Sequence, residues 1–423
     1  MNRASTSVML GSIVLLCTSA SISGAGTDRA TARSSRSGSD GVATTNPAAD
    51  RPTASGAVRV DEPSLRVEAP LAGPGVAMLP ARRLAPMPHR RLTVAFAGDT
   101  LAHSPVVQHA WSNGAGTGFD FRPIFARVAP IIGAADLAIC HLETPVAPPG
   151  QPLSTFPVYG VPAEIAAGIA SAGYDRCSTA SNHSLDRGTA GIDATVAALE
   201  MNGLGQSGMA RSPDEVTAPV VTVAGIAVAH LSYTYGFNGL ALPAAEPWRA
   251  NPIDPVRIVA DALDARVRGA EIVIVSLHWG VEKVVAPTAY QREVAATITA
   301  SGAVDLIVGH HAHVLQPIEV INGRWVVFGL GNSLSNMPTG DSWPASTQDG
   351  AVLTVTIEQQ PDGSLAVQQP VVIPTWVDRD GGFVIRPVLS DLADPSVSDG
   401  VKAELAASLA RTTAVLGPFI ATT

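Results

Sequence analysis

Short apolar runs, each followed directly by polar residues, are the feature that most limits how this chain can fold. Runs at 92–97, 136–140, 176–181, 271–277 and 305–309 have the length of buried strands, and helical patterns at 162–173, 191–203, 254–269 and 287–302 alternate with several of them. Turn residues at Gly225 and at Asn322-Gly323 predict β-hairpins, as does the pattern of 351–373, and 400–411 is amphipathic. The pattern predicts one α/β domain with helices flanking a mixed sheet or a pair of sheets.

The first 90 residues have a different character. Arg3, the apolar run at 8–17 and a small-residue site ending at Ala25 predict a secretory signal peptide over 1–25, with an uncleaved membrane anchor as the alternative. Residues 26–90 are rich in Ala, Ser, Pro and Arg and predict a disordered linker. The folded part then divides into a main domain at 91–340 and a C-terminal segment at 341–423 whose strands and helix complete it.

Charge and cysteine content narrow the classes of function. The formal net charge of -9 excludes a basic nucleic-acid-binding surface, so no nucleic-acid partner is expected. Removal of the signal peptide would leave Cys140 and Cys177, which form either a disulfide or two buried thiols.

Histidine, carboxylate and carboxamide side chains gather at the ends of the predicted strands. Seven of the ten histidines lie in the five segments that follow these strands. Ligands of α/β proteins bind at the carboxyl ends of parallel strands, so we expect the five segments to converge. The polar residues concerned are Asp99, His103, His141, Glu143, Asn182, His183, Asp186, His278, Glu282, His310, His311 and His313.

This mixture of side chains predicts a metal site. Imidazole nitrogens together with carboxylate and amide oxygens suit one or two divalent ions, with Mn, Zn or Fe as the candidates. If 310–313 is extended, its period of two places His311 and His313 on the metal side and turns His310 elsewhere. His183 is the candidate general acid, and Asp186 either orients it or caps the following helix.

Six ordered blocks carry a resemblance to a known family. The chain resembles the CapA-type capsule-biosynthesis family, which is associated with poly-γ-glutamate synthesis and grouped structurally with the calcineurin-like metallophosphoesterases. The resemblance implies a two-sheet α/β/β/α sandwich with a metal site at one edge. The blocks are FAGDTLAH, CHLETPV, ASNHSLDRG, SLHWGVE, VGHHAHVLQPIE and FGLGNSLSN.

The resemblance also implies roles for individual residues. Its metal ligands correspond to Asp99, Glu143, Asn182, His278, His311 and His313, with His183 as the general acid. From its position in the sequence, Asp186 is the expected catalytic partner of His183. Additional ligands are likewise expected among His103, His141, Glu282 and His310, and substrate contacts at Arg187 and Asn332. Leu101 stands where the wider superfamily has a ligand histidine, and His141 stands where many relatives have asparagine. The number of metals therefore stays open.

Three functions are compatible with these features. The first is a secreted or cell-envelope protein of capsule or poly-γ-glutamate biosynthesis, with a metal-dependent hydrolase site that acts on an anionic polymer. Membrane-bound polymer synthesis or export proteins are its expected partners. The second is a metal-dependent phosphoesterase with a phosphoester substrate. The third is a polymer-binding scaffold without catalysis.

Overall fold

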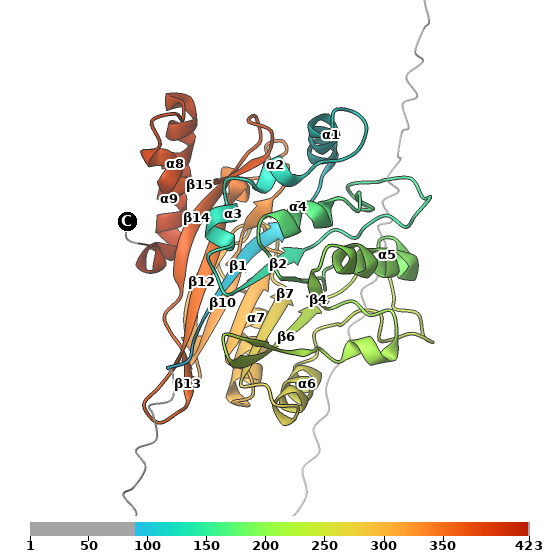
Figure 1. Ribbon diagram of the computed structural model, residues 1–423, viewed down its shortest axis with the longest axis vertical. Helices are drawn as coiled ribbons and strands as arrows, with labels where there is room; N and C mark the ends of the chain where they lie inside the picture. The colour runs from blue at the N-terminus through green and yellow to red at the C-terminus, as the bar shows by residue number, and fades with distance from the viewer. Residues whose placement is uncertain (1–88, 422–423) are drawn as a thin grey trace, which may run out of the picture. The chain divides into compact units, whose positions relative to one another are not determined.

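The computed structural model describes residues 89–421, which form one body built on two β-sheets (Figure 1). The expected signal peptide and nearly all of the expected linker lie outside the described residues. Within 89–421, no helix has both the length and the apolar character that crossing a bilayer requires.

The first sheet has nine strands, with β1 near its centre. Strands β1, β2, β3 and β4 are parallel to one another, whereas β12, β14 and β15 continue the sheet beyond β1 in antiparallel pairing. β11 pairs with the end of β1, and β13 pairs with β12. The strands are β1 (Arg91–Thr100), β2 (Leu137–Leu142), β3 (Arg176–Ser178), β4 (Gly205–Ser207), β11 (Asn332–Leu334), β12 (Asp349–Gln359), β13 (Leu365–Val367), β14 (Val371–Asp378) and β15 (Val384–Pro387).

The second sheet has six strands in the order β5-β6-β7-β8-β10-β9. Its four inner strands are parallel, and an antiparallel strand closes each edge. The strands are β5 (Val220–Val223), β6 (Ile226–Thr234), β7 (Ile272–His278), β8 (Leu306–His310), β9 (Leu315–Ile321) and β10 (Arg324–Leu330). The hairpins predicted at Gly225 and at Asn322-Gly323 are confirmed as β5-β6 and β9-β10.

Period-two alternation explains how the two sheets stack. In β1, Phe96 joins an apolar cluster that also contains Ile274 and Val308 of the second sheet, so this cluster lies between the sheets. The intervening Ala95 and Val275 belong to different clusters on the outer faces. Both sheets are therefore buried on two sides, as their nearly continuous apolar sequences require.

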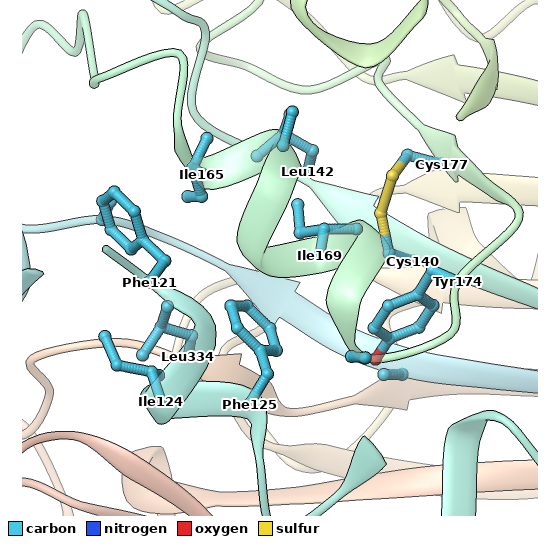
Figure 2. Packing of buried hydrophobic residues seen from close by; sticks show 14 of the residues in the cluster. Phe121, Ile124, Phe125, Cys140, Leu142, Ile165, Ile169, Tyr174, Cys177 and Leu334 are labelled. Atoms are coloured by element: carbon cyan, nitrogen blue, oxygen red, sulfur yellow. A yellow bond between two sulfur atoms is a disulfide. The ribbon is translucent and has the colours of Figure 1, made fainter. Parts of the chain in front are cut away.

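Helices cover the two outer faces. α2 and α4 pack on the first sheet through Phe121, Phe125, Ile165 and Ile169 (Figure 2), and α6 and α7 pack on the second. The predicted two-sheet α/β/β/α sandwich is thus confirmed. The helices are α1 (Ser104–Asn113), α2 (Arg122–Phe125), α3 (Ala129–Ile132), α4 (Ile165–Ser171), α5 (Gly188–Met201), α6 (Pro255–Val267), α7 (Ala289–Ala300), α8 (Val388–Ala393) and α9 (Asp399–Leu416), with short 3-10 turns at Pro213–Val216, Ala345–Gln348 and Gly417–Phe419.

Local signals account for where several helices begin. Thr288 and Gln291 form a reciprocal capping box at the start of α7. Asp254 accepts hydrogen bonds from the first turn of α6, and Pro255 supplies the preset backbone angle of its first position. These caps fix the chain direction just before and after β7, which carries His278.

The C-terminal segment is part of the same body. β12 pairs along nearly the whole of β1, and α9 is attached to β12 by the buried carboxylate of Asp349, which accepts hydrogen bonds from Ser408 and Arg411. α8 and α9 lie beside β14 (Figure 1).

Cys140 and Cys177 form a disulfide between β2 and β3 (Figure 2). Of the two forms that the sequence leaves open, the structure thus has the disulfide. Both residues lie in the outer cluster beneath α4, whereas their neighbours His141 and Ser178 face the other way.

Candidate metal centre

The carboxyl ends of the parallel strands bring the polar segments together. In the first sheet, Asp99, His141 and Ser178 lie in register on β1, β2 and β3. In the second sheet, His278 and His310 lie in register on β7 and β8. These two rows meet at one edge of the sandwich, which is where an α/β fold presents its ligand site.

Asp99 connects the two sheets at this edge. Its Oδ1 lies 3.1 Å from His310 Nδ1, and its Oδ2 accepts a hydrogen bond of 2.9 Å from the His311 backbone N–H. Burial raises the pKa of Asp99, but hydrogen bonds from His310 and His313 outweigh burial and hold the pKa well below its usual value. The preceding Gly98 is required for this placement, because a Cβ there would lie 2.3 Å from the Gly331 carbonyl oxygen.

Glu143 is a fully buried carboxylate for which the described residues provide no hydrogen-bond partner at either oxygen. His313 Nε2 lies 3.8 Å from its Oε1. Burial raises the pKa of Glu143 well above its usual value, although the charge of His313 opposes this. A buried carboxylate without a partner is costly unless a cation neutralises it.

His311 completes the same pattern. Its Nδ1 is also buried without a partner, and one ligand atom each of Glu143, His311 and His313 lies within 4.8 Å of the other two. Buried ligand atoms that face one another without hydrogen bonds fit a metal ion better than they fit an apolar core.

His141 is held by a chain of hydrogen bonds that determines its tautomer. Its Nδ1 lies 2.8 Å from the Ser178 hydroxyl, which also contacts the Cys140 carbonyl oxygen at 3.2 Å. Its Nε2 lies 2.9 Å from His278 Nδ1. One row of hydrogen bonds thus joins Ser178, His141 and His278, and the direction of its protons sets the tautomer of both rings.

The same row of hydrogen bonds continues from His278 to Asn182. His278 Nε2 lies 2.9 Å from Asn182 Oδ1, and the Asn182 amide nitrogen donates to Asn238. Burial lowers the pKa of His278 well below its usual value, so the ring carries a single proton. In the tautomer with this proton on Nδ1, the Nε2 lone pair and the Asn182 oxygen can bind the same cation.

Asn332 orients His313. The carboxamide oxygen lies 3.0 Å from His313 Nδ1, and the amide nitrogen donates to the Thr347 carbonyl oxygen at 2.8 Å. His313 therefore presents Nε2 toward Glu143. Burial lowers the pKa of His313, but Glu143 and Asp99 outweigh burial and raise the pKa to about 9.

The expected extended geometry of 310–313 is wrong. His311 and His313 have φ angles of 86° and 54°, so both adopt left-handed backbone conformations rather than the alternation of a strand. His310, which was expected to point elsewhere, is the last residue of β8 and contacts Asp99 while its ring stacks on His141 at 4.0 Å.

His183 and Asp186 form a hydrogen-bonded pair at the rim of the centre. His183 Nδ1 lies 2.7 Å from Asp186 Oδ2, which also accepts from the Tyr159 backbone N–H. The structure shows the first of the two roles expected of Asp186, which is contact with His183. It does not show the second role, since no side chain caps the start of α5. Both residues line a hollow of about 370 Å³ that also reaches Asn182 and Glu282.

Three other candidates lie outside the group of buried ligands. His103 accepts a hydrogen bond from the Asn336 N–H and packs edge-on against Tyr159. Glu282 is half-buried at the hollow that reaches His311.

Arg187 was expected to contact substrate, but its guanidinium donates to Gln151, Ser154 and the Pro152 carbonyl oxygen and so holds a loop. The substrate contact expected at Asn332 is likewise unsupported, because its side chain is fully buried against His313.

Comparison with known proteins agrees with this arrangement. The family model of the bacterial capsule synthesis protein PGA_cap matches residues 93–337, which is more than half of the 423-residue chain. The chain belongs to this family. The matched region contains every candidate ligand described above.

Two curated relatives of the capsule family name its biological setting. The PGA biosynthesis protein CapA of Bacillus subtilis is 28% identical over 281 residues, covering 65% of this chain and 70% of that protein. The capsule biosynthesis protein CapA of Bacillus anthracis is 28% identical over 260 residues, covering 59% of this chain and 62% of that protein. The predicted family is thereby confirmed.

Two solved structures show a fold-level likeness. The calcineurin-like phosphoesterase YfkN of Bacillus subtilis has a TM-score of 0.39 and 16% identity, covering 76% of this chain and 99% of that chain. The NAD nucleotidase of Haemophilus influenzae has a TM-score of 0.42 and 11% identity, covering 79% of this chain and 64% of that chain.

Several residues of this capsule-family site were not predicted. Ser178 lies inside a predicted strand, and only the register of β2 and β3 reveals its contact with His141. Tyr235 packs on His311 with ring centroids 4.6 Å apart, and Asn238 contacts Asn182. Both follow β6, whose sequence was interpreted as one strand of a hairpin. The residues after the end of this strand were therefore not considered as part of the site.

Proposed function

We propose that this capsule-family protein is a metal-dependent hydrolase that acts on an anionic polymer of the cell envelope, with poly-γ-glutamate as the first candidate. The observation that carries the proposal is the unpartnered, fully buried carboxylate of Glu143 facing His311 and His313. The printed names of the relatives, PGA biosynthesis and capsule biosynthesis, support the choice of polymer.

The donor set supports one or two divalent ions. Glu143, His311 and His313 would hold one ion, and Asn182 with His278 would provide ligands on the opposite side of the same space. Mn, Zn and Fe suit this combination of nitrogen and oxygen donors. A bound cation of this kind supplies Lewis-acid polarisation and makes water a stronger nucleophile.

His183 would act as the proton donor of the reaction. Its Nδ1 is engaged by Asp186, so Nε2 is the nitrogen available to a molecule in the neighbouring hollow. The carboxylate fixes the tautomer and the ring orientation, which is the geometry that a general acid requires. Tyr159 packs edge-on against the same imidazole at 4.7 Å and limits its rotation.

Phosphoester hydrolysis is the second candidate. Asn182, His183 and Asp186 lie together beside the metal ligands, an arrangement that suits in-line displacement at phosphorus as well as addition of water to a carbonyl carbon. Leu101 lacks the ligand atom that the wider superfamily carries there, but His141 and His310 lie close to Asp99 instead.

We propose location in the cell envelope, with membrane-bound polymer synthesis or export proteins as partners. The Cys140–Cys177 disulfide supports this location, because such bonds persist in oxidising compartments. The capsule-related names of the relatives support it independently.

Turnover by the full chain, loaded with Mn or Zn, tests the proposal. We expect shortening of poly-γ-glutamate, and loss of about 10²–10⁴-fold in rate for His183→Ala. His109→Ala, on α1 against Phe383, is the matched control and retains full activity. Cleavage of an aryl phosphodiester without cleavage of the polymer would favour the second candidate. Polymer binding without any turnover would contradict the catalytic proposal and leave the scaffold function.

A further inference from the structure

Three hollows surround the candidate metal centre and share walls. The His183 hollow, described above, is separated by Phe156 from a second hollow of about 330 Å³, named here the Trp343 hollow. A third hollow of about 370 Å³ reaches His311 and shares Glu282 with the His183 hollow. The Trp343 hollow is lined by His103, Ser104, Pro105, Thr155, Phe156, Asn336, Met337, Thr339 and Trp343.

Charge is distributed unequally among these hollows. The His183 hollow contains the carboxylates of Asp186 and Glu282. The walls of the Trp343 hollow contain no carboxylate, and two basic residues outside its lining contact residues of these walls. One of them, Lys283, lines the third hollow. Lys283 Nζ lies 4.4 Å from the centre of the Trp343 ring, and Arg379 Nε donates to Asn336 Oδ1 at 3.2 Å.

Neither basic residue has an acidic partner in the part of the chain that the structure describes. Most other arginines of the described chain form an ion pair, as Arg411 does with Asp349 and Arg292 does with Glu319. Both Lys283 and Arg379 are only half-exposed, so each gives up part of its hydration without receiving a counter-charge. A bound anion would supply that counter-charge.

The position of Lys283 is tied to the metal ligands. Its backbone is left-handed, with φ of 66°, and its N–H donates to the carbonyl oxygen of Ala312 at 2.8 Å. Ala312 lies between His311 and His313. Lys283 is also one of only two lysines in the chain, the other being Lys402 on α9.

We propose that a carboxylate-bearing segment of the polymer lies across Trp343, between the third hollow and the Trp343 hollow. Lys283 would contact a carboxylate group from the third hollow, Arg379 would contact one beside Asn336, and Phe156, Met337 and Trp343 would pack on the methylene groups between them. This inference rests on the proposed function and extends it by assigning the residues that select an anionic chain. A polymer seated there would pass from the Trp343 hollow over Phe156 toward His183.

His103 adds a neutral donor to this hollow. Its Nδ1 accepts from the Asn336 N–H, so Nε2 carries the proton. Burial lowers the pKa of His103 to about 4, and the ring therefore stays uncharged at neutral pH. The positive charge next to the Trp343 hollow consequently comes from Lys283 and Arg379, which contact Trp343 and Asn336 of its lining.

Calorimetric titration of the metal-loaded full chain with a γ-linked glutamate oligomer of defined length tests the assignment. Lys283→Gln and Arg379→Gln are each expected to weaken binding about tenfold at low salt. Lys402→Gln and Arg91→Gln remove a lysine and an arginine elsewhere and leave the affinity unchanged. Arg379→Lys keeps the charge and retains most of the affinity, which separates charge from packing.

The outcomes distinguish this inference from the proposed function. Loss of affinity in both Gln variants, together with failure of the wild type to bind the same oligomer with its carboxyl groups amidated, supports the assignment even if no turnover is seen. Unchanged affinity in both Gln variants, or an equal loss in the two controls, overturns the assignment even if the polymer is hydrolysed. Thermal unfolding and metal content of each variant verify that a loss of affinity does not come from a loss of fold.

Discussion

At the scale of single residues, the carboxylate of Glu143 links metal binding to stability. A ligand that binds only the folded state stabilises it by about 3 kcal/mol at roughly 100 times its dissociation constant. We expect added metal to raise the free energy of unfolding of the wild type by about this amount, and Glu143→Gln to abolish most of the gain, because the amide removes the charge that faces His311 and His313. Denaturant unfolding with metal or with chelator measures the difference.

Glu293→Gln is the matched control for this prediction. Glu293 is exposed on α7 and forms no ion pair within the described chain. The control should retain the full stabilisation by metal. Equal stabilisation of Glu143→Gln and wild type would show that Glu143 does not hold an ion.

Ser178 is expected to act on the metal through two histidines. Ser178→Ala removes the hydroxyl that contacts His141 Nδ1 and so loosens the ring that orients His278. Residues that orient a metal-bound histidine typically contribute 10–100-fold to affinity. We therefore expect metal affinity to fall by about 10–100-fold.

Ser207→Ala is the comparison for Ser178→Ala, since Ser207 lies in register with Ser178 on the neighbouring strand β4. Competition with a metal-sensitive dye measures both affinities. If both variants bind metal as tightly as the wild type, the hydrogen-bond chain through Ser178 has no part in the site.

Residue types and their positions after strands predicted which side chains meet, but not how each one is oriented. His310 was expected to face away, because an extended segment was assumed, whereas positive φ angles at His311 and His313 turn the chain back. Positive φ angles at two non-glycine residues on either side of Ala312 are not indicated by any sequence pattern. Asn332 presents the same difficulty. Whether it orients His313 or contacts substrate depends on the partners of its carboxamide, which only the structure shows.

At the scale of elements, the disulfide between β2 and β3 is expected to stabilise the fold without affecting metal binding. Cys140 and Cys177 are 37 positions apart, and a crosslink that closes such a loop contributes about 2–4 kcal/mol. We expect Cys140→Ala/Cys177→Ala to lower the free energy of unfolding by this amount while metal stoichiometry is retained. The reason is that alternate residues of β2 face opposite sides, so Cys140 contacts the helix layer and His141 contacts the metal ligands.

Unfolding in denaturant with and without reductant tests the contribution of this disulfide. Reductant should shift the wild-type curve to lower denaturant concentration and leave the double variant unchanged. A wild-type curve that reductant does not move would contradict the disulfide, and loss of metal from the double variant would contradict the separation of the two faces.

Elements that depend on local pattern were predictable, whereas their long-range pairing was not. The apolar runs ending at Cys140, Leu277 and Gly309 are strands. Three of the four helical patterns contain a helix, and the fourth, 191–203, overlaps α5, which begins earlier at Gly188. The insertion of β12 beside β1 joins residues more than two hundred positions apart in the 423-residue chain, and no periodicity indicates that neighbour. α1 was also missed, because Pro105 and His109 interrupt its short apolar pattern.

At the scale of the whole molecule, the site exists because the parallel strands of both sheets end at the same edge of the sandwich. Asp99 on the first sheet accepts a hydrogen bond from the His311 backbone, which follows the second sheet. Neither sheet alone supplies both the carboxylates and the three histidines at 310–313. The family match ends at residue 337, yet β12 and α9 beyond it stabilise β1 and thus the position of Asp99.

The most direct test of the metal centre is elemental mass spectrometry of the purified full chain, with wild type beside His311→Ala/His313→Ala and the control His109→Ala. We expect one or two equivalents of Mn, Zn or Fe in the wild type and in the control, and loss of the metal in the double variant. Absence of metal from the wild type after reloading with Mn or Zn, or full retention by the double variant, would contradict this expectation.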